Sequence, residues 1–540
     1  MISRLTRSER DSLLEVAQGT VRGKATAVAA YGSKVAGYSR ADSDYDLIVV
    51  TKKFNGGIGY RYLTSPVVAS ALIVEEDLLE RDARKAFLGE FVSGRLLNAY
   101  EPLLNPGVFE AADDEGKKRV IAEGIWELGS QYGEFAQDLI IPLDYFLFDK
   151  LHKRALIYPP ALYSYAKTYT CSLGAENRAF SREGFAKAAK SMEKEGFIRV
   201  EDGNVRIVGE GLKSTAFAKA LVLFNLTTRG MKQYAVHGYV GRVGLSIIKD
   251  EALSKMRRMQ AKVEPPKELA DPTRLLGLDE GMIVQKSEQM VERLATRDGL
   301  VAYTKREKSL GEIYSTAKQV TLHGNRETRY VFKHFADIRS MKWALLNVWS
   351  ASTRFSMSPQ ARMHREYQAT RVLREAGVST PKILGAVLED KVLVKEFVDG
   401  TRLSDIVQGI MDGEDGDFDA VKRYGAAVGQ VHKTGLALGD SKANNIIVNG
   451  SRLYFTDLEQ AVEGGDQAWD VAEFVYYAAK LSFKGRGLKM VADAFLEGYE
   501  EANGSENIRK AKHQKYVRPF RPLTPPAVLA AIRESLESYS

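Results

Sequence analysis

Two aspartates and an asparagine near the C-terminus have the types and spacing to hold a divalent metal ion beside a reacting hydroxyl. Asp440 and Asn445 lie five residues apart on one loop, and Asp457 ends a hairpin that turns at Asn449-Gly450. Asp440 can accept the proton of an acceptor hydroxyl, while Asn445 and Asp457 supply the oxygen ligands that Mg²⁺ prefers. Lys442, two residues after Asp440, can reach a γ-phosphate. The spacing therefore predicts phosphoryl transfer.

Upstream residues are expected to bind the nucleotide. Lys333 lies in an apolar strand, where its ammonium can contact the α- and β-phosphates, and Glu366 lies on an amphipathic helix as its ion-pair partner. A later apolar strand runs into a glycine turn and predicts a hinge at Glu396 and Val398 that would bind adenine through its backbone. The phosphate loop is placed at Gly311, although it holds a single glycine. ATP and Mg²⁺ are the cofactors that this series predicts.

Each of these residues alone also fits a plain structural role. Asp440 and Asp457 would then be turn or cap residues, and Lys333 a lysine at a strand edge. The order of five such elements along the chain favours a kinase fold instead. Asp470 begins the next helix, where an aspartate commonly braces the catalytic loop.

The series resembles the small atypical kinases, above all the kinase subunit of the KEOPS tRNA-modification complex and, more distantly, the RIO kinases. The closest matches are the runs 366–381 and 439–447. The pattern departs at Asp457, which is followed by Leu-Glu instead of Phe-Gly, and no long activation loop fits between Asp457 and Trp469. The resemblance therefore implies ATP–Mg²⁺ chemistry without the protein-substrate platform of ordinary Ser/Thr kinases.

A second motif lies near the N-terminus. A Gly-Ser turn at Gly32 and Ser33 starts a short helix, and Asp44 and Asp46 begin an apolar strand. This order resembles the polymerase-β-type nucleotidyltransferases, in which the turn contacts a triphosphate and the two aspartates share two Mg²⁺ ions. The strand that should carry a third carboxylate, within 65–74, has no acid. We therefore expect a degenerate site that binds nucleotide or RNA and is inert in transfer.

Two further segments suggest contact with nucleic acid. Helices followed by a hairpin across Asp202-Gly203 resemble a winged helix-turn-helix with Arg182, Lys187 and Lys190 on its second helix, although such modules also serve as spacers. The basic tail at 509–521 carries Tyr516 and Phe520 among its lysines and arginines. Phosphate contacts with base stacking would suit RNA, and a solvated tail is the equal alternative.

Length and composition indicate several globular domains. Of 540 residues, 44% are apolar, and 77 basic against 70 acidic residues give a net charge of +7. The single cysteine, Cys171, excludes intramolecular disulfides and fits a reducing cytoplasm. We expect no secretory signal and no membrane span. The expected parts are 1–110, 111–212, 213–270 and 271–540, with a linker at the Pro-rich stretch that begins at Val263.

A nucleotidyltransferase-like domain, a winged-helix and helical middle and a KEOPS-like kinase in one chain resemble the archaeal RNA kinase family. The resemblance implies an α/β and α+β multidomain fold that ends in an atypical bilobal kinase-like domain. It also implies transfer of the ATP γ-phosphate to a ribose 2′-hydroxyl of tRNA, in a variable-loop uridine, by a cytoplasmic enzyme. An atypical Ser/Thr protein kinase or KEOPS-like ATPase, a non-catalytic RNA-binding scaffold and, more distantly, a nucleotidyltransferase stay open. The sequence does not set the oligomeric state.

Overall fold

The described residues fall into two compact units. The computed structural model describes residues 4–208, 264–310, 317–336, 358–413, 416–478, 485–521 and 524–539. The first unit comprises residues 1–132 and 136–277, and the second comprises 133–135 and 278–540. Most of the expected connector at 213–270, together with Gly311 of the expected phosphate loop, lies outside the described residues. Along the parts that are described, no helix combines the length and apolar character needed to cross a membrane.

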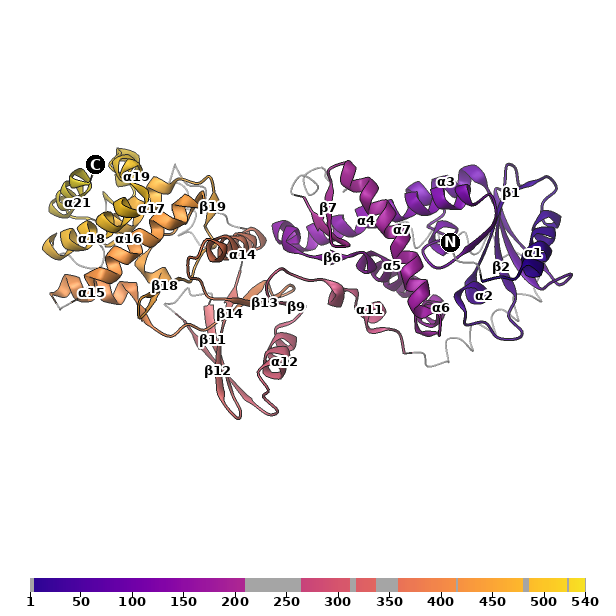
Figure 1. Ribbon diagram of the computed structural model, residues 1–540, viewed down its shortest axis with the longest axis horizontal. Coiled ribbons are helices and arrows are strands. Elements are labelled where there is room, and N and C mark those ends of the chain that lie inside the picture. Colours follow the sequence, from indigo (N-terminus) through magenta and orange to yellow (C-terminus); the bar gives the residue numbers. More distant parts are fainter. Residues whose placement is uncertain are drawn as a thin grey trace. The chain divides into compact units, whose positions relative to one another are not determined.

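A five-stranded sheet forms the N-terminal part of the first unit (Figure 1). The elements are α1 Arg7–Gly19, β1 Ala25–Tyr31, α2 Gly32–Ala36, β2 Tyr45–Thr51, β3 Ile58–Leu63, β4 Ala69–Glu75, α3 Glu76–Lys85 and β5 Glu101–Leu104. The strand order is β3-β4-β2-β1-β5, with β2 and β4 parallel. Alternating apolar residues bury both faces, one under α1 and the other under α3. The sequence predicts β1, β2 and β4, which are confirmed, whereas β3 and β5 emerge only in the structure.

The rest of the first unit is mainly helical. Its elements are α4 Pro106–Tyr132, β6 Ile141–Pro142, α5 Leu143–Ile157, α6 Pro160–Thr170, α7 Gly174–Lys194, β7 Ile198–Glu201, β8 Asn204–Ile207 and α11 Lys267–Ala270. The hairpin predicted across Asp202-Gly203 is confirmed as β7 and β8, and β6 extends it to three strands. Arg182 of α7 donates to both carboxylate oxygens of Asp144, so its charge is already paired within this unit.

The expected linker after Val263 is not a free tether. Leu269 of α11 is fully buried, and its carbonyl lies 2.9 Å from Nδ1 of His152 on α5. The backbone of Ile140 also exchanges two hydrogen bonds with Gly277. Because these contacts pack 264–277 onto the first unit, the structure places the boundary between units at 277/278. The proline-rich composition concealed this packing, in which Leu269 is the fully buried apolar contact.

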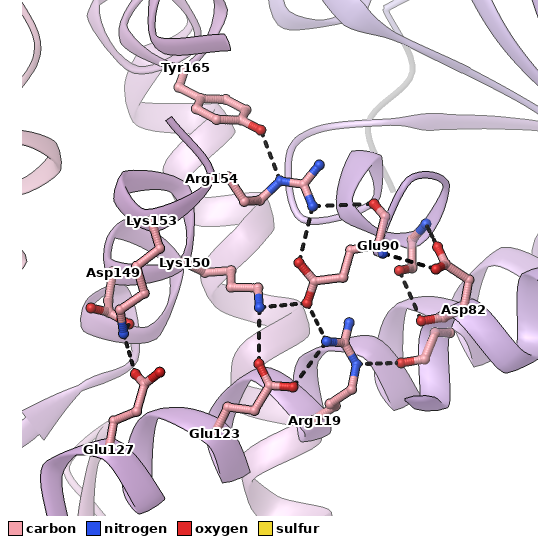
Figure 2. Close-up of polar contacts among 12 residues, drawn as sticks. Asp82, Glu90, Arg119, Glu123, Glu127, Asp149, Lys150, Lys153, Arg154 and Tyr165 are labelled. Carbon is pink, nitrogen blue, oxygen red and sulfur yellow. Dashed lines mark hydrogen bonds and ion pairs between the residues drawn. The ribbon is translucent and has the colours of Figure 1, made fainter. Parts of the chain in front are cut away.

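A buried ionic network joins α4 and α5 to the loop after α3 (Figure 2). Glu90 in that loop is 2% exposed, and its carboxylate contacts Arg119, Lys150 and Arg154. Asp82 of α3 is fully buried and accepts four backbone N–H bonds from the same loop, at 2.8 to 3.0 Å. The network therefore fixes the loop against both helices through charges that water does not screen.

The second unit begins with a six-stranded sheet (Figure 1). Its elements are β9 Met282–Val284, α12 Ser287–Arg297, β10 Thr304–Ser309, β11 Ala317–His323, β12 Glu327–His334, α14 Pro359–Glu375, β13 Ile383–Val387 and β14 Val392–Glu396. The strand order is β10-β11-β12-β14-β13-β9. Val320, Leu322, Tyr330 and Phe332 pack with α12 on one face. Because side chains alternate along a strand, Lys333 faces the opposite side, where it meets α14.

The remainder of the second unit is a helical lobe with two small sheets. Its elements are β15 Thr401–Arg402, α15 Leu403–Asp412, α16 Phe418–Lys433, β16 Leu436–Ala437, β17 Ile446–Asn449, β18 Arg452–Phe455, β19 Val462–Glu463, α17 Gln467–Ala478, α18 Gly485–Asn503, α19 Glu506–Ala511, α20 Gln514–Val517 and α21 Pro526–Ser538. One large apolar core joins α15 to α18 and α21. The second of the two paired strands β17 and β18 leads directly to Asp457.

The prediction that Tyr516 and Phe520 stack on bases is wrong. Tyr516 is 2% exposed and Phe520 6% exposed, and both belong to the apolar core of the lobe. The Phe520 ring stacks on Trp469 and Tyr476, with centroids 5.8 and 5.5 Å apart. Their four-residue spacing puts both rings on one side of a helical turn, so they bury together while the neighbouring cations point outward.

Candidate active site

The loop before β17 and the end of β18 bring Asp440, Asn445 and Asp457 together. The side-chain amide of Asn445 donates to the carbonyl oxygen of Asp440 at 3.0 Å and to its Oδ2 at 3.3 Å. The carbonyl oxygen of Asn445 accepts from the N–H and the hydroxyl of Thr456, at 2.9 and 2.8 Å. Asp457 is the next residue, so all three predicted groups lie at one end of a single hairpin.

Asp470 holds the loop in position from α17. Its fully buried carboxylate accepts from the N–H groups of Leu438 and Gly439, at 2.6 and 2.8 Å, and lies 2.9 Å from Nε2 of His432. Gly439 has φ +70°, and a Cβ there would lie 2.7 Å from the carbonyl oxygen of Gln460. The glycine is thus required by the backbone, and the expected bracing role of Asp470 has a geometric basis.

Lys333 of β12 and Glu366 of α14 form the expected ion pair, 2.8 Å apart. The Lys333 ammonium also lies 2.7 Å from Oδ1 of Asp457 and 3.3 Å from Glu459. Burial favours the neutral amine, but the carboxylates of Asp457, Glu366 and Glu459 outweigh it and raise the pKa of Lys333 well above its usual value. Burial opposes ionisation of Asp457 too, yet Lys333 and then Lys395 lower its pKa. Both groups are therefore charged.

Sequence reasoning missed three members of this cluster, namely Lys395, Arg362 and Glu459. Arg362 of α14 is 1% exposed and contacts both oxygens of Glu459, at 3.1 and 3.2 Å. Lys395 of β14 is 3% exposed and contacts Glu366. The signal for Lys395 was in the sequence, because a lysine inside an apolar strand is the same pattern that singled out Lys333.

The donor set at this end of the hairpin fits Mg²⁺. Asn445 uses its amide N–H₂ group toward Asp440, which leaves its amide oxygen without a hydrogen bond from the described residues. Oδ1 of Asp457 accepts hydrogen bonds from the Lys333 ammonium and from the N–H of Glu459. Oδ2 of Asp457 accepts none from the described residues. An amide oxygen and a carboxylate oxygen are hard ligands of the kind that Mg²⁺ takes alongside phosphate oxygens.

The predicted hinge residues lie where β14 ends. The side chain of Glu396 accepts from the N–H of Lys382 at 2.9 Å, and its own N–H donates to the Lys382 carbonyl at 2.9 Å. The side chain of Glu396 is thus engaged in the turn, and Val398 is half-buried two residues on. The role of both residues in binding adenine stays a prediction.

Lys442 lies between two carboxylates. Its ammonium contacts Asp440 and lies 3.6 Å from Glu473 of α17, a residue that sequence reasoning also missed. Glu473 accepts from the Ser441 N–H at 2.8 Å. Burial raises the pKa of Glu473 to about 8, with the charges of Asp440 and Asp470 adding to the shift and Lys442 opposing it. Near neutral pH, therefore, Glu473 is largely protonated, and Asp440 is the charged partner of Lys442.

We expect Glu473 to make the second unit less stable as pH rises. Its usual pKa is 4.5 and its pKa in the folded protein is about 8, so between these values the folded state holds a proton that the unfolded state has lost. Stability then falls as pH rises through this window and levels off above it. The difference in melting temperature between the native chain and Glu473→Gln should therefore shift against the native chain as pH rises from about 4.5 to about 8. A difference in melting temperature that stays constant across this pH range would contradict the prediction.

The N-terminal motif also gathers at one place. Gly32 has φ +78°, and a Cβ there would lie 2.0 Å from Oδ2 of Asp46, so only glycine admits the aspartate so closely. Ser33 follows in α2, and Asp44 lies one residue before β2. The strand register places Ser70 of β4 directly beside Asp46. The position where a third carboxylate would complete a metal site thus holds a hydroxyl.

A cation lies over this motif instead. The guanidinium of Arg95 donates to the hydroxyls of Tyr31 and Tyr60, at 3.0 and 2.7 Å, and its charge interacts with Asp46. Within the described parts of the chain, no group of three or more His, Cys, Asp or Glu side chains could hold a metal ion. Arg95 would repel a divalent ion from the remaining aspartates.

The sheet, α14 and the helical lobe together define a protein-kinase-like domain, with Lys333 and Glu366 over a loop that carries Asp440, Asn445 and Asp457. Residues 311–471 match the family model of the RIO domain. This part of the chain is a RIO kinase-like domain, within a protein of mixed α/β fold.

Curated relatives match part of the chain. The chain is 30% identical over 137 residues to the probable serine/threonine-protein kinase BUD32 homolog of Archaeoglobus fulgidus, covering 25% of this chain and 64% of that protein. It is 24% identical over 157 residues to the KEOPS complex subunit Bud32 of Pyrococcus abyssi, covering 28% and 70%. It is 32% identical over 97 residues to a probable bifunctional tRNA threonylcarbamoyladenosine biosynthesis protein of Methanothermobacter thermautotrophicus, covering 18% and 17%.

Proposed function

We propose that this chain is an ATP-dependent RNA kinase that transfers the γ-phosphate to a ribose 2′-hydroxyl of tRNA, in a variable-loop uridine. The observation that carries the proposal is the convergence of Asp440, Asn445 and Asp457 beside the ion pair of Lys333 and Glu366. The amide of Asn445 donates to Asp440, and the carbonyl oxygen of Asn445 accepts from Thr456, the residue before Asp457. These groups supply the base, the metal ligands and the phosphate clamp that phosphoryl transfer needs.

Asp440 is the base in this mechanism, and Lys333 binds the α- and β-phosphates. The acceptor oxygen attacks the γ-phosphorus as the bond from that phosphorus to the β-γ bridging oxygen breaks, and the hydroxyl proton passes to a carboxylate oxygen of Asp440. ADP leaves with the bridging oxygen. Lys442, held beside Asp440, offsets charge on the transferring group. Mg²⁺, held by Asn445 and Asp457, would neutralise the phosphate oxygens.

Two cations on β10 support a polyanionic acceptor. All six residues of β10 are exposed, and its register pairs Arg306 with Thr321 and Lys308 with Gln319. These residues share the face of Lys333, because Lys305 and Glu307 pair with each other on the side of α12. Arg306 and Lys308 have no acidic partner among the described residues. In this proposal they contact the phosphates of an RNA strand that enters the site.

The names of the relatives favour tRNA as the acceptor but also support a second candidate. One relative is a subunit of the KEOPS complex and another is named for tRNA threonylcarbamoyladenosine biosynthesis. A further relative is named as a probable serine/threonine-protein kinase, so an atypical protein kinase or KEOPS-like ATPase is the alternative. The expected division of the first unit, with a winged helix in its middle, belongs to the proposal as well, and the kinase part then begins at Leu278.

We assign the N-terminal sheet to a nucleotidyltransferase-like domain that binds nucleotide or RNA and does not catalyse transfer. Ser70 beside Asp46 and the cation of Arg95 support this assignment. Two-metal catalysis needs a further carboxylate, which Ser70 does not supply, and the positive charge of Arg95 weakens the attraction of Asp46 for a divalent ion. Gly32, Ser33, Asp44 and Asp46 would then contact a ligand without activating it.

Transfer from labelled ATP tests the proposal. The full chain is incubated with total tRNA and protein substrates, using ATP labelled at the α- or the γ-phosphate. We expect γ-label on tRNA. Label on protein alone would favour the protein-kinase alternative, α-label on tRNA would restore catalysis to the N-terminal domain, and no transfer would favour a non-catalytic scaffold. The Arg306→Ala/Lys308→Ala variant should lose label on tRNA, whereas the matched Lys305→Ala/Lys318→Ala variant on the opposite face should keep it.

A further inference from the structure

The residue that departs from the common kinase pattern after Asp457 has a buried partner. Glu459 occupies the position where that pattern has a glycine, and both of its carboxylate oxygens accept from Arg362 of α14, at 3.1 and 3.2 Å. We propose that Arg362 and Glu459 are positioning residues that hold the metal ligand Asp457 in the orientation needed for phosphoryl transfer. The inference rests on the proposed function and goes beyond its base, metal ligands and phosphate clamp.

Arg362 connects three parts of the second unit. It lies near the start of α14, which begins at Pro359. One terminal nitrogen of its guanidinium donates to Glu459, and the other donates to the carbonyl oxygen of Ala336, just after β12. Arg362 is 1% exposed, so water screens these contacts little. Because the donors of a guanidinium have fixed directions in one plane, Arg362 sets the position of Glu459 relative to both α14 and β12.

The segment after Asp457 is attached to α14 at two points. The N–H of Leu458 donates to Oε2 of Glu366 at 2.9 Å, and the side chain of Glu459 contacts Arg362. Arg362 and Glu366 are four residues apart, so they lie on one face of the helix about a turn from each other. Two attachments fix the orientation of the segment as well as its position, whereas a single attachment would allow it to rotate.

This attachment reaches the metal ligand directly. The N–H of Glu459 donates to Oδ1 of Asp457 at 3.3 Å, and Lys333 donates to the same oxygen at 2.7 Å. These bonds orient the carboxylate with Oδ2 toward the metal ion. Arg362 also neutralises Glu459, whose carboxylate lies 3.3 Å from the Lys333 ammonium. Glu459 therefore competes less for this ammonium, and the ion pair of Lys333 with Glu366 stays formed.

The short return of the chain after Asp457 gives the pair its importance. In ordinary kinases the activation loop controls the position of the metal-binding aspartate and of the helix that carries the glutamate. Here β19 pairs with β16, and α17 begins at Gln467, so the chain rejoins the helical lobe soon after Asp457. The buried pair from α14 to residue 459 thus supplies a connection that a long loop would otherwise make.

Magnesium-dependent binding of a fluorescent ATP analogue tests this role without turnover. The Mg²⁺ concentration for half-maximal binding is compared among the native full chain, Arg362→Met, Glu459→Met and the double variant. We expect it to rise by about 10–100-fold in all three variants, the usual cost of removing an outer partner of a metal ligand. Arg374→Met is the matched control, since it removes an arginine of the same helix that pairs with Glu280, and it should leave the Mg²⁺ requirement unchanged.

Thermal melting separates positioning from a loss of structure. Each single variant leaves one buried charge without its partner and should melt at a lower temperature, whereas the double variant leaves an apolar pair and should regain stability. We therefore expect a stable double variant that still needs more Mg²⁺. A double variant that melts no higher than the single ones, or that needs no more Mg²⁺ than the native chain, would overturn the inference. A native chain that binds the analogue but transfers no γ-phosphate would instead overturn the proposed function.

Discussion

Asp440→Asn should reduce γ-phosphate transfer to tRNA by about 10²–10⁴-fold, the usual contribution of a positioned base. The substitution removes the group that accepts the proton and leaves the loop in place, because the new side chain still offers an oxygen to the amide of Asn445. The rate of γ-label transfer under single-turnover conditions, with ATP and tRNA both saturating, measures the effect on chemistry alone.

Binding controls define what this result means. Affinity for tRNA and for ATP should change little, since Asp440 contributes to the chemical step in this mechanism rather than to either binding event. Asp419→Asn, at an exposed position on α16, is the matched control and should transfer at the native rate. Near-native transfer by Asp440→Asn would assign the base to another group and remove the central residue of the mechanism.

The site was predictable where its residues are close in the sequence. Asp440, Asn445 and Asp457 lie on one loop and one hairpin, so local spacing was enough to predict that they meet. The pairing of Lys333 with Glu366 was also recoverable, because an isolated charge on an apolar strand needs a partner. Arg362 and Glu459 were missed because each makes sense only with the other, and they are 97 residues apart.

Predictions from the sequence were wrong where the burial of a side chain depends on tertiary packing. Tyr516 and Phe520 lie among cations, and composition alone favours exposure, but Trp469 and Tyr476 cover the Phe520 ring. The segment after Val263 reads as a linker, yet Leu269 anchors it. Strands β3 and β5 were not predicted because Gly59 and Arg61 interrupt the apolar residues of β3 and because β5 is short. In each case a long-range contact decides the outcome, and periodicity does not report such contacts.

The ionic network around Glu90 was also not predicted from the sequence, and it stabilises the first unit. Glu90 meets cations from α4 and α5 that lie 29 to 64 residues away. Arg119 and Lys150 also share Glu123, so the network has three cations and two such carboxylates at its centre. Such a network is costly to disturb at one point, because the remaining charges stay buried.

Glu90→Gln should destabilise the first unit by about 3–5 kcal/mol, the cost of removing one partner from a buried pair. Arg119, Lys150 and Arg154 would keep their charges with little water to solvate them. Hydrogen–deuterium exchange of α4 measures this unit separately from the second.

A surface pair and a compensating change show whether burial and charge balance cause the loss. Glu115→Gln removes a partner of Arg84, at a site where the two side chains are 35% and 55% exposed, and should cost at most about 1 kcal/mol. Adding Lys150→Met to Glu90→Gln removes one of the stranded cations and should restore part of the stability. A double variant less stable than Glu90→Gln alone would show that packing of the lysine stem, rather than the balance of charge, dominates at this position.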